Sequence, residues 1–314
     1  MWRFAVRRLF HSLLLLWGVS ALSFAIMHLA PGGPVQFLED PRFSPQVAAE
    51  IEASFGLHEP IWVQYVRWMG GIARLDFGRS FSDNRPVIDK IVERWPNSLQ
   101  LSMAGLAIGL LGIPLGIISA VKRGTALDSA IRVVLALLNA VPHWWLGLII
   151  LIVSATTFPI FPMGGMTSVG RGDLIDRLWH MALPATLMGM GGWIVFSRFL
   201  RAEMLDLMRQ DFVRTARAKG VRERRVVTHH VLRNALIPVA TILGGSLPAL
   251  FSGALLIETV FSWPGLGRLF FEAANGRDYP LLMGLTVIGS VLVLLGNLLA
   301  DLLYGVLDPR VRYD

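Results

Sequence analysis

Six long apolar stretches, nearly free of charged side chains, constrain this chain more than any other feature. They cover residues 9–30, 99–121, 131–157, 180–197, 235–257 and 279–304, and Asp301 lies in the last of them. A helix needs about 20 apolar residues to cross the hydrocarbon core of a bilayer. Because only 16% of the residues are charged, the sequence predicts an all-α integral membrane protein with six transmembrane helices.

The first stretch follows Arg3, Arg7 and Arg8, a charge pattern that also occurs in secretory signal peptides. Its apolar run of about 22 residues exceeds the 7–15 residues of a signal peptide's apolar region. We therefore expect a retained transmembrane helix. The absence of cysteine excludes a disulfide-stapled scaffold, and the 54% hydrophobic content excludes intrinsic disorder.

Lysine and arginine are distributed unevenly between the loops on the two sides of the predicted membrane. With the N-terminus placed in the cytoplasm, 18 of the 29 basic residues fall on the cytoplasmic side. The positive-inside rule then predicts that both termini are cytoplasmic. Topology therefore explains the net charge of +7, and we expect no nucleic-acid partner.

The segment between the first two stretches, residues 31–98, is far longer than a turn requires, which predicts an extracytoplasmic subdomain. Ser44 and Gly56 mark the start and end of one short amphipathic helix. Pro60 starts a second helix, which Gly70 and Gly71 end. This subdomain is either a cap on the bilayer or bundle, or a docking surface for an extracytoplasmic partner.

The loop over residues 198–234 is basic, with ten lysines and arginines in 37 residues, and it retains a helical pattern. Met204, Met208, Phe212 and Ala216 recur at helical spacing, and Gly220 occupies a C-terminal stop position. The pattern predicts a helix, a tight turn and a second helix. Small residues and long cations alternate over 214–220, which is typical of a surface that another protein approaches closely. The alternative is a loop whose charge serves topology alone.

Several chemical sites are absent from the sequence. No glycine-rich phosphate loop ending in Gly-Lys-Ser/Thr occurs, so we expect no ATP-binding site or other cofactor site in this chain. His229 and His230 are adjacent and face different directions on a helix, and no cysteine is present, so we expect no metal site. We also expect no catalytic residues, since no Ser/His/Asp arrangement stands out.

Ionisable groups within spans are rare here, whereas an ion-coupled carrier needs several. Asp301 and Glu258 lie near span ends, where structural roles are favoured. The candidate translocation-path residues are Asn139 and His143, which flank Pro142, and Asn297 in the last span. Hydrogen bonding between neighbouring helices is the alternative role for these side chains.

A series of short motifs, in order along nearly the whole chain, resembles one family. These motifs are Ala30-Pro31-Gly32-Gly33-Pro34, Phe55-Gly56-Leu57, Leu75-Asp76-Phe77-Gly78-Arg79-Ser80, Arg85-Pro86-Val87, His180-Met181-Ala182-Leu183-Pro184, Arg214 to Gly220, Glu258 to Gly267, Arg277-Asp278-Tyr279-Pro280 and Asp308-Pro309-Arg310. The chain resembles the inner-membrane permease subunits of peptide-type ABC importers, which include dipeptide, oligopeptide, glutathione and nickel permeases.

The resemblance implies a fold and a set of partners. It implies six transmembrane helices with an extracytoplasmic helical insertion after the first, built on a MetI-like type I ABC permease core. It implies that the chain forms half of a channel in the bacterial inner membrane. The other half is a homologous second permease, and the remaining partners are two ATPase subunits, which bind ATP and Mg, and an extracytoplasmic binding protein.

The resemblance also assigns roles to residues. The motif Arg214, Thr215, Ala216, Arg217, Ala218, Lys219 and Gly220 matches the cytoplasmic coupling helix that docks on an ATPase subunit. Arg214 stands where the wider family prefers glutamate, and Leu232-Arg233 replaces a Leu-Pro pair; the peptide-type subfamily shares both changes. A segment near the outer mouth is expected to gate the channel or contact the binding protein, through Glu258, Phe261, Trp263, Pro264 and Gly265.

The expected organisation is a first helix plus outer subdomain (1–98) and a permease core (99–314) that contains the coupling loop (198–234). The expected function is ATP-driven import of short peptides. Nickel chelates, glutathione and opine or sugar-like solutes are alternative cargoes for the same machine. The rival functions are a secondary carrier, which would show inverted repeats and midplane carboxylates, and a scaffold whose basic loop binds anionic lipid.

Overall fold

The computed structural model describes residues 2–29, 59–252 and 254–307, and the regular elements within these ranges are helices. In chain order they are α1 (Trp2–Leu29), α4 (Ile61–Ile72), α5 (Val87–Gly109), α6 (Gly112–Val121), α7 (Ala126–Ala140), α8 (His143–Thr156), α9 (Leu174–Leu207), α10 (Asp211–Ala218), α11 (Glu223–Arg225), the π-helix η1 (Val226–Val231), α12 (Leu232–Ser252), α13 (Leu255–Val260), α14 (Leu266–Asn275) and α15 (Tyr279–Leu307).

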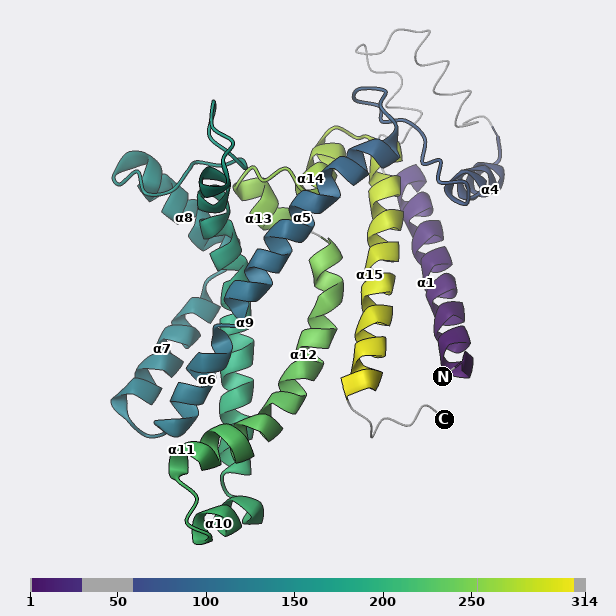
Figure 1. Ribbon diagram of the computed structural model, residues 1–314. Helices are drawn as coiled ribbons and strands as arrows, with labels where there is room; N and C mark the ends of the chain where they lie inside the picture. Colours follow the sequence, from purple (N-terminus) through teal and green to yellow (C-terminus); the bar gives the residue numbers. More distant parts are fainter. Residues whose placement is uncertain (1, 30–58, 253, 308–314) are drawn as a thin grey trace.

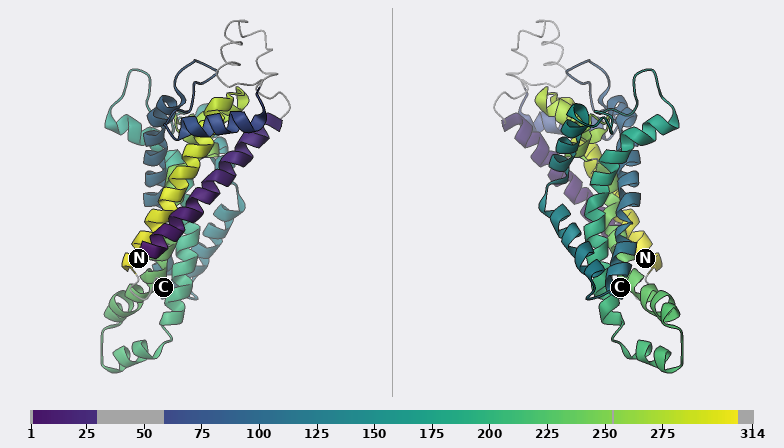
Figure 2. Two further views of the ribbon diagram at one scale, coloured as in Figure 1. Left: turned by 90° about the vertical axis from the view of Figure 1, so that its right-hand side faces the viewer. Right: turned by 90° about the vertical axis from the view of Figure 1, so that its left-hand side faces the viewer.

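The long helices run between two ends of the molecule (Figure 1). The end that carries α10 and α11 is referred to below as the inner end, and the end that carries α4, α13 and α14 as the outer end. The first residues of α1 and the last residues of α15 both lie toward the inner end (Figures 1 and 2). The described start of α1 and the end of α15 thus lie toward the same end of the molecule, and the prediction that both termini are cytoplasmic stays a prediction.

Five of the described helical segments are long and apolar enough to cross a bilayer, and the number rises to six if α7 and α8 together count as one bent span. The predicted third span, residues 131–157, is therefore not one continuous helix. It breaks between Ala140 and His143 with a bend of 90°. The reason is Pro142, which disfavours helical geometry at the residue before it; Val141 is accordingly extended, with φ −110° and ψ 130°.

Two other predicted spans have different bounds. The second span begins at Val87 instead of residue 99, so the outer end of α5 occupies part of the predicted 31–98 subdomain. The fifth was expected to reach residue 257, but α12 ends at Ser252 and α13 is a separate helix. Ala254, the residue before α13, has φ −117° and ψ 79°, which is not helical.

The helix expected after Pro60 is confirmed as α4, which continues through both glycines to Ile72. It is fixed to the outer end of α1 by hydrogen bonds between Ser20 Oγ and Tyr65 Oη at 2.8 Å and between His28 Nε2 and Gln64 Oε1 at 3.1 Å. The helix expected over residues 45–56 lies outside the described residues.

The α5–α6 segment packs very closely along α9. A Cβ atom at Gly112 would lie 2.8 Å from the Gly192 carbonyl oxygen and 2.8 Å from Trp193 Cα. Such small residues let two helix backbones approach and pack by van der Waals contact, the interaction that holds helices together inside a membrane. The long helix α9, which leads directly into α10, is thus held firmly against its neighbours.

A hydrophobic cluster, the inner core, joins the inner halves of several spans. It consists of Ala120, Phe196, Leu200, Met204, Leu207, Val213, Ala216, Val226, Val231, Ala235 and Val239. These residues come from α6, α9, α10, η1 and α12. The inner core therefore binds α10 to three spans as one packed unit.

Candidate functional site

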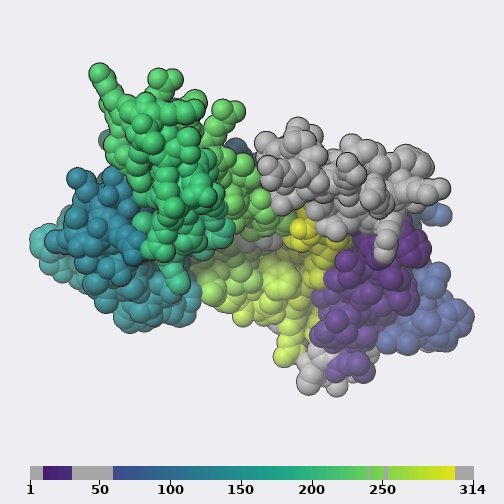
Figure 3. All heavy atoms as spheres, turned by 90° about the horizontal axis from the view of Figure 1, so that it is seen from below, coloured from purple at the N-terminus to yellow at the C-terminus, as the bar shows by residue number. Residues whose placement is uncertain are grey.

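The loop over residues 198–234 projects from the inner end and carries the motif singled out in the sequence (Figure 1). Viewed from the inner end, its green atoms gather into one bulge beside the teal atoms of α6 and α7 (Figure 3). The predicted succession of helix, turn and helix is present, with one difference. The expected single helix through Met204 and Ala216 is divided, because α9 ends at Leu207 and α10 begins at Asp211.

The turn after α10 depends on Gly220, which has a φ of +74°. This left-handed conformation favours glycine, because a Cβ atom clashes with the backbone there. The Val221 amide donates to the Ala216 carbonyl at 3.2 Å, and the Gly220 amide donates to that of Arg217 at 2.9 Å. Gly220 therefore acts as the helix stop that the sequence predicts.

The two faces of α10 have different surroundings. Val213 is fully buried and Ala216 is 8% exposed, both within the inner core. Ala216 thus faces the protein's own interior, although the sequence placed it among the residues open to a partner. Arg214, Thr215 and Ala218 are exposed on the other face, and this face is free to receive another surface.

An ion pair closes the turn that follows α10. Arg217 donates to Glu223 through Nε at 3.0 Å and through Nη2 at 2.6 Å. This hydrogen bonding from Arg217 lowers the pKa of the Glu223 carboxyl below its ordinary value. The pair braces the end of α10 against the start of α11.

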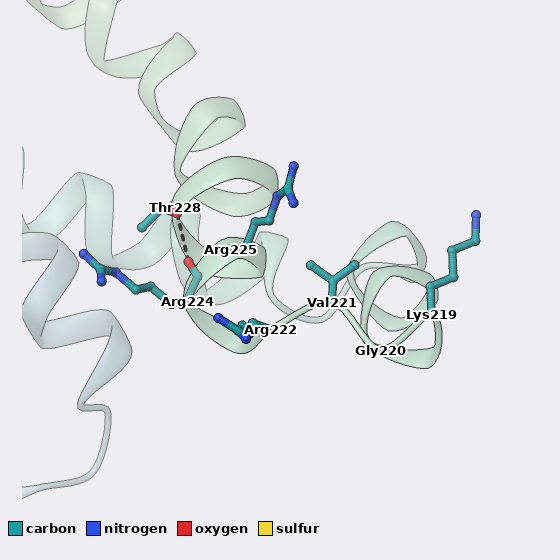
Figure 4. A pocket seen from close by; sticks show the side chains of 7 residues that line it. All are labelled: Lys219, Gly220, Val221, Arg222, Arg224, Arg225 and Thr228. Atoms are coloured by element: carbon teal, nitrogen blue, oxygen red, sulfur yellow. Dashed lines mark hydrogen bonds between the residues drawn. The ribbon is translucent and has the colours of Figure 1, made fainter.

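A hollow of about 560 Å³ lies between the end of α10 and the α11–η1 turn. Figure 4 shows Lys219 on one wall, Arg222, Arg224 and Arg225 on the other, and Val221 between them. Its lining residues are Lys219, Gly220, Val221, Arg222, Arg224, Arg225 and Thr228. Four of the seven are cationic and none is acidic, so the hollow has the character of an anion-binding surface.

A buried ion pair that the sequence analysis missed connects this loop to the α6–α7 turn. Asp128 is 1% exposed and accepts from Arg201 Nε at 3.0 Å and Nη2 at 2.8 Å. It also accepts from Ser119 Oγ at 2.5 Å and from the Gly124 amide at 3.1 Å. In the sequence, Asp128 is recognisable only as an acidic residue in the first turn of α7, three residues after the N-capping Thr125. That position does not indicate that Asp128 binds Arg201.

The three expected path residues do not form one group. Asn139 is exposed at the end of α7, and His143 is half-buried at the start of α8, on either side of the 90° bend. Asn297 is half-buried on α15, which packs against α1, α12, α14 and α5. The structure therefore brings Asn139 and His143 near one hinge and places Asn297 in a different part of the bundle.

The segment 258–267 is at the outer end, as expected, but its large side chains are buried instead of exposed. Phe261 is 3% exposed and Trp263 is fully buried. The Trp263 indole donates to the Asn97 backbone carbonyl at 2.9 Å, and the Asn97 side-chain Nδ2 donates to the Pro264 carbonyl at 2.9 Å. This segment is a packed element against the outer end of α5.

Glu258 holds this packed element together. It is fully buried and accepts from Ser98 Oγ at 2.7 Å, the Arg268 amide at 3.1 Å and the Ala254 amide at 3.2 Å. A Cβ atom at Gly265 would collide with the Glu258 carboxylate and with Ser98 Oγ. The close approach explains why the segment carries glycine at this position.

A second buried carboxylate, Asp278, joins two of the sequence motifs. It is 2% exposed, at the start of α15, and accepts from the Phe81 amide at 3.1 Å and from Ser80 Oγ. The loop before α5 is thereby tied to α15. Within the described residues, no group of three or more His, Asp or Glu side chains is arranged to hold a metal ion.

Comparison with known proteins gives two family matches that together span almost the whole chain. Residues 112–313 match the binding-protein-dependent transport system inner membrane component, and residues 1–103 match the N-terminal family of the same membrane components. The chain is 40% identical over 313 residues to the oligopeptide transport system permease protein AppB of Bacillus subtilis, covering 99% of each chain.

The chain is also 36% identical over 338 aligned residues to the dipeptide transport system permease protein DppB of Escherichia coli K12, covering 100% of this chain and 99% of the relative. Among solved structures it is similar to a chain of the inward-facing MetNI methionine ABC transporter. That similarity has a TM-score of 0.54 at 16% identity and covers 70% of this chain and 96% of the other. At this identity the likeness concerns the fold alone, and it supports the expected MetI-like core.

Proposed function

This chain belongs to the family of binding-protein-dependent transport system inner membrane components, and from that premise we propose that it forms half of the channel of an ATP-driven importer of short peptides. The observation that carries the proposal is end-to-end similarity to permeases named for oligopeptide and dipeptide transport. Such a subunit conducts a solute and catalyses no reaction itself. ATP and Mg bind to the partner ATPase subunits.

The partners are a second homologous permease, two ATPase subunits and an extracytoplasmic binding protein. The chain lies in the bacterial inner membrane with its inner end, and hence both termini, in the cytoplasm. The basic loop at the inner end supports this orientation, because cytoplasmic loops are enriched in lysine and arginine. The first helix and the outer subdomain precede α5, and the permease core begins with α5 at Val87.

The exposed face of α10 is the contact with an ATPase subunit. Closure of the ATPases around ATP can change the channel only if contacts at this face differ between the two states of the ATPase pair. The opposite face of α10 contributes Val213 and Ala216 to the inner core. A displacement of α10 is therefore carried to α6, α9 and α12, since close-packed interiors transmit strain instead of absorbing it.

The proposal is tested by reconstituting the complete complex in proteoliposomes with its binding protein and a labelled dipeptide. We expect uptake that requires ATP, together with ATPase activity that the loaded binding protein stimulates. Uptake driven by an ion gradient without ATP would overturn the importer, and ATP-driven uptake of nickel chelates or glutathione without peptides would overturn the cargo.

A matched pair of variants tests the role of α10. Ala218→Trp places a bulky side chain on its exposed face, whereas Leu137→Trp places one at an exposed apolar position on α7, which is 65% exposed. We expect Ala218→Trp to abolish ATP-driven uptake while membrane insertion is retained, and Leu137→Trp to have little effect. Normal uptake by Ala218→Trp would contradict the assignment of the docking face.

A further inference from the structure

The hollow beside α10 is lined by four positively charged side chains that have no acidic partner among the described residues. Within the described residues, Lys219, Arg222, Arg224 and Arg225 form no ion pair. The acidic residue between them in the sequence, Glu223, is already engaged by Arg217. The hollow therefore presents four cations, and none of them has a counter-charge within the part of the chain that the structure describes.

Three other cations of the same loop are paired, whereas Arg198, Arg209 and Arg233 form no ion pair within the described residues. Arg201 binds the buried Asp128, Arg214 lies 3.3 Å from Asp211, and Arg217 binds Glu223. The four cations of the hollow come from one short stretch, residues 219–225, and their side chains point in different directions, with those of Lys219 and Arg224 on opposite sides (Figure 4). An acidic occupant would supply the counter-charge that these cations lack within the described residues.

The walls of the hollow are preformed. The Arg217–Glu223 pair joins them, and fully buried Val226 anchors the α11–η1 side in the inner core. The Thr228 hydroxyl donates to the Arg224 carbonyl at 2.8 Å, which fixes the first turn of the π-helix. A surface held in this way loses little conformational entropy when a partner binds.

We propose that this hollow receives an acidic segment of the ATPase subunit, as a second contact beside the exposed face of α10. The inference rests on the proposed function, because it assigns an acidic surface to the ATPase subunit that is proposed to dock on α10. The position favours a protein occupant over a lipid headgroup: one wall is the end of α10, the element that projects farthest beyond the spans at the inner end (Figures 1 and 4). Four cations spread over two walls match an extended acidic surface.

Such a contact acts mainly on association and on its salt dependence, since exposed charge pairs are weak singly and are screened by salt. The test uses the complete complex, purified through this chain, with release of the ATPase subunits measured as NaCl is raised. The variant is Arg222→Gln with Arg225→Gln. The control, Lys122→Gln with Arg123→Gln, removes two exposed cations from the α6–α7 turn, outside the hollow.

We expect the hollow variant to raise the dissociation constant of the ATPase at 50 mM NaCl by about 2- to 30-fold, from two pairs of ordinary surface strength. The difference from the unaltered complex should shrink at 500 mM NaCl, and the control should match the unaltered complex throughout. Reversal of charge, Arg222→Glu with Arg225→Glu, should weaken binding further. Equal affinity and equal salt dependence in all variants would overturn the inference.

Two other outcomes are distinguishable. If the unaltered chain retains no ATPase at any salt concentration, the proposed function itself fails. The same affinities are measured in nanodiscs that contain 30% phosphatidylglycerol and in nanodiscs of pure phosphatidylcholine. If the hollow variant binds the ATPase more weakly than the unaltered chain only where phosphatidylglycerol is present, the occupant is an anionic lipid and the inference is overturned. Retention by the unaltered chain and a loss in pure phosphatidylcholine support an acidic protein surface.

Discussion

The ion pair between Asp128 and Arg201 gives the sharpest quantitative prediction about the inner end. Asp128 is 1% exposed, whereas the Arg201 side chain is 23% exposed. Removing one member of a buried pair leaves an uncompensated charge and costs about 3–5 kcal/mol. Because Arg201 retains some access to water, we place the cost of Asp128→Asn near the lower limit, at about 3 kcal/mol.

The reverse substitution, Arg201→Met, leaves the more deeply buried charge behind. Asp128 then keeps Ser119, the Gly124 amide and Arg132, whose Nε lies 3.3 Å away, so we again expect a cost of about 3 kcal/mol. The double variant leaves no buried charge from the pair, and its cost should also be about 3 kcal/mol or less. The coupling energy between the two sites is therefore at least about 3 kcal/mol.

The assay is equilibrium unfolding of the purified chain in mixed micelles for the two single variants and the double variant. Peptide uptake per ATP hydrolysed is measured on the assembled complex with the same variants. The single variants should lower this ratio, because α7 is no longer fixed to the helix that leads into α10. Additive effects in the double variant, or single costs below about 1 kcal/mol, would refute the claim that the pair is desolvated.

Three further predictions concern other parts of the molecule. Gly112→Val should destabilise the chain by about 1–3 kcal/mol through overpacking against α9. The control Gly18→Val should not destabilise it, because a Cβ at residue 18 meets no atom within 4 Å. Equal thermal unfolding temperatures for the two variants would contradict the close approach of α6 and α9. Glu258→Gln should cost about 2 kcal/mol, because its NH₂ group replaces one carboxylate oxygen and so faces at least one donating backbone amide, that of Ala254 or that of Arg268; unchanged thermal unfolding would contradict this. The pKa of the Glu223 carboxyl is lowered in the folded chain, so its ion pair with Arg217 is present above the ordinary carboxyl pKa of 4.5 and is lost as the pH falls through the lowered pKa. Hydrogen exchange of the backbone amides at the end of α10 should accelerate over that acidic interval. An exchange rate that does not change with pH in this interval would contradict the prediction.

The sequence predicted the helices well because long apolar stretches admit few other structures in a bilayer. It predicted the bounds less well, because apolarity alone does not mark where a helix bends. Pro142 was visible in the sequence, yet proline is tolerated within other helices of this chain, at Pro96, Pro184 and Pro238. α7 packs against α6 and α9, whereas α8 packs against α9 and α13, and a sequence pattern does not contain these contacts.

Site residues were predictable where backbone conformation dictates the residue type, as at Gly220. They were not predictable where tertiary contacts decide. Ala216 and Phe261 follow patterns that also occur on exposed surfaces, and only the fold reveals that both are buried. The partner of Asp128 lies 73 residues away, a separation at which a sequence pattern contains no pairing information.

The break at Pro142 separates two helices, α7 and α8, that have contacts at opposite ends of the molecule. On the inner side, α7 is fixed to α9 through Asp128 and Arg201. On the outer side, α8 packs against α13, and Gly147 lies so close to Phe261 that a Cβ there would be 2.9 Å from the ring. Because α9 also contacts α8 and α13 directly, a displacement of α10 that moves α9 reaches the outer end both along α9 and through α7, across the bend at residues 141–142. The chain thus has a continuous set of contacts from the proposed ATPase-docking face to the packed segment 258–267, and its branch through α7 and α8 crosses the bend at Pro142.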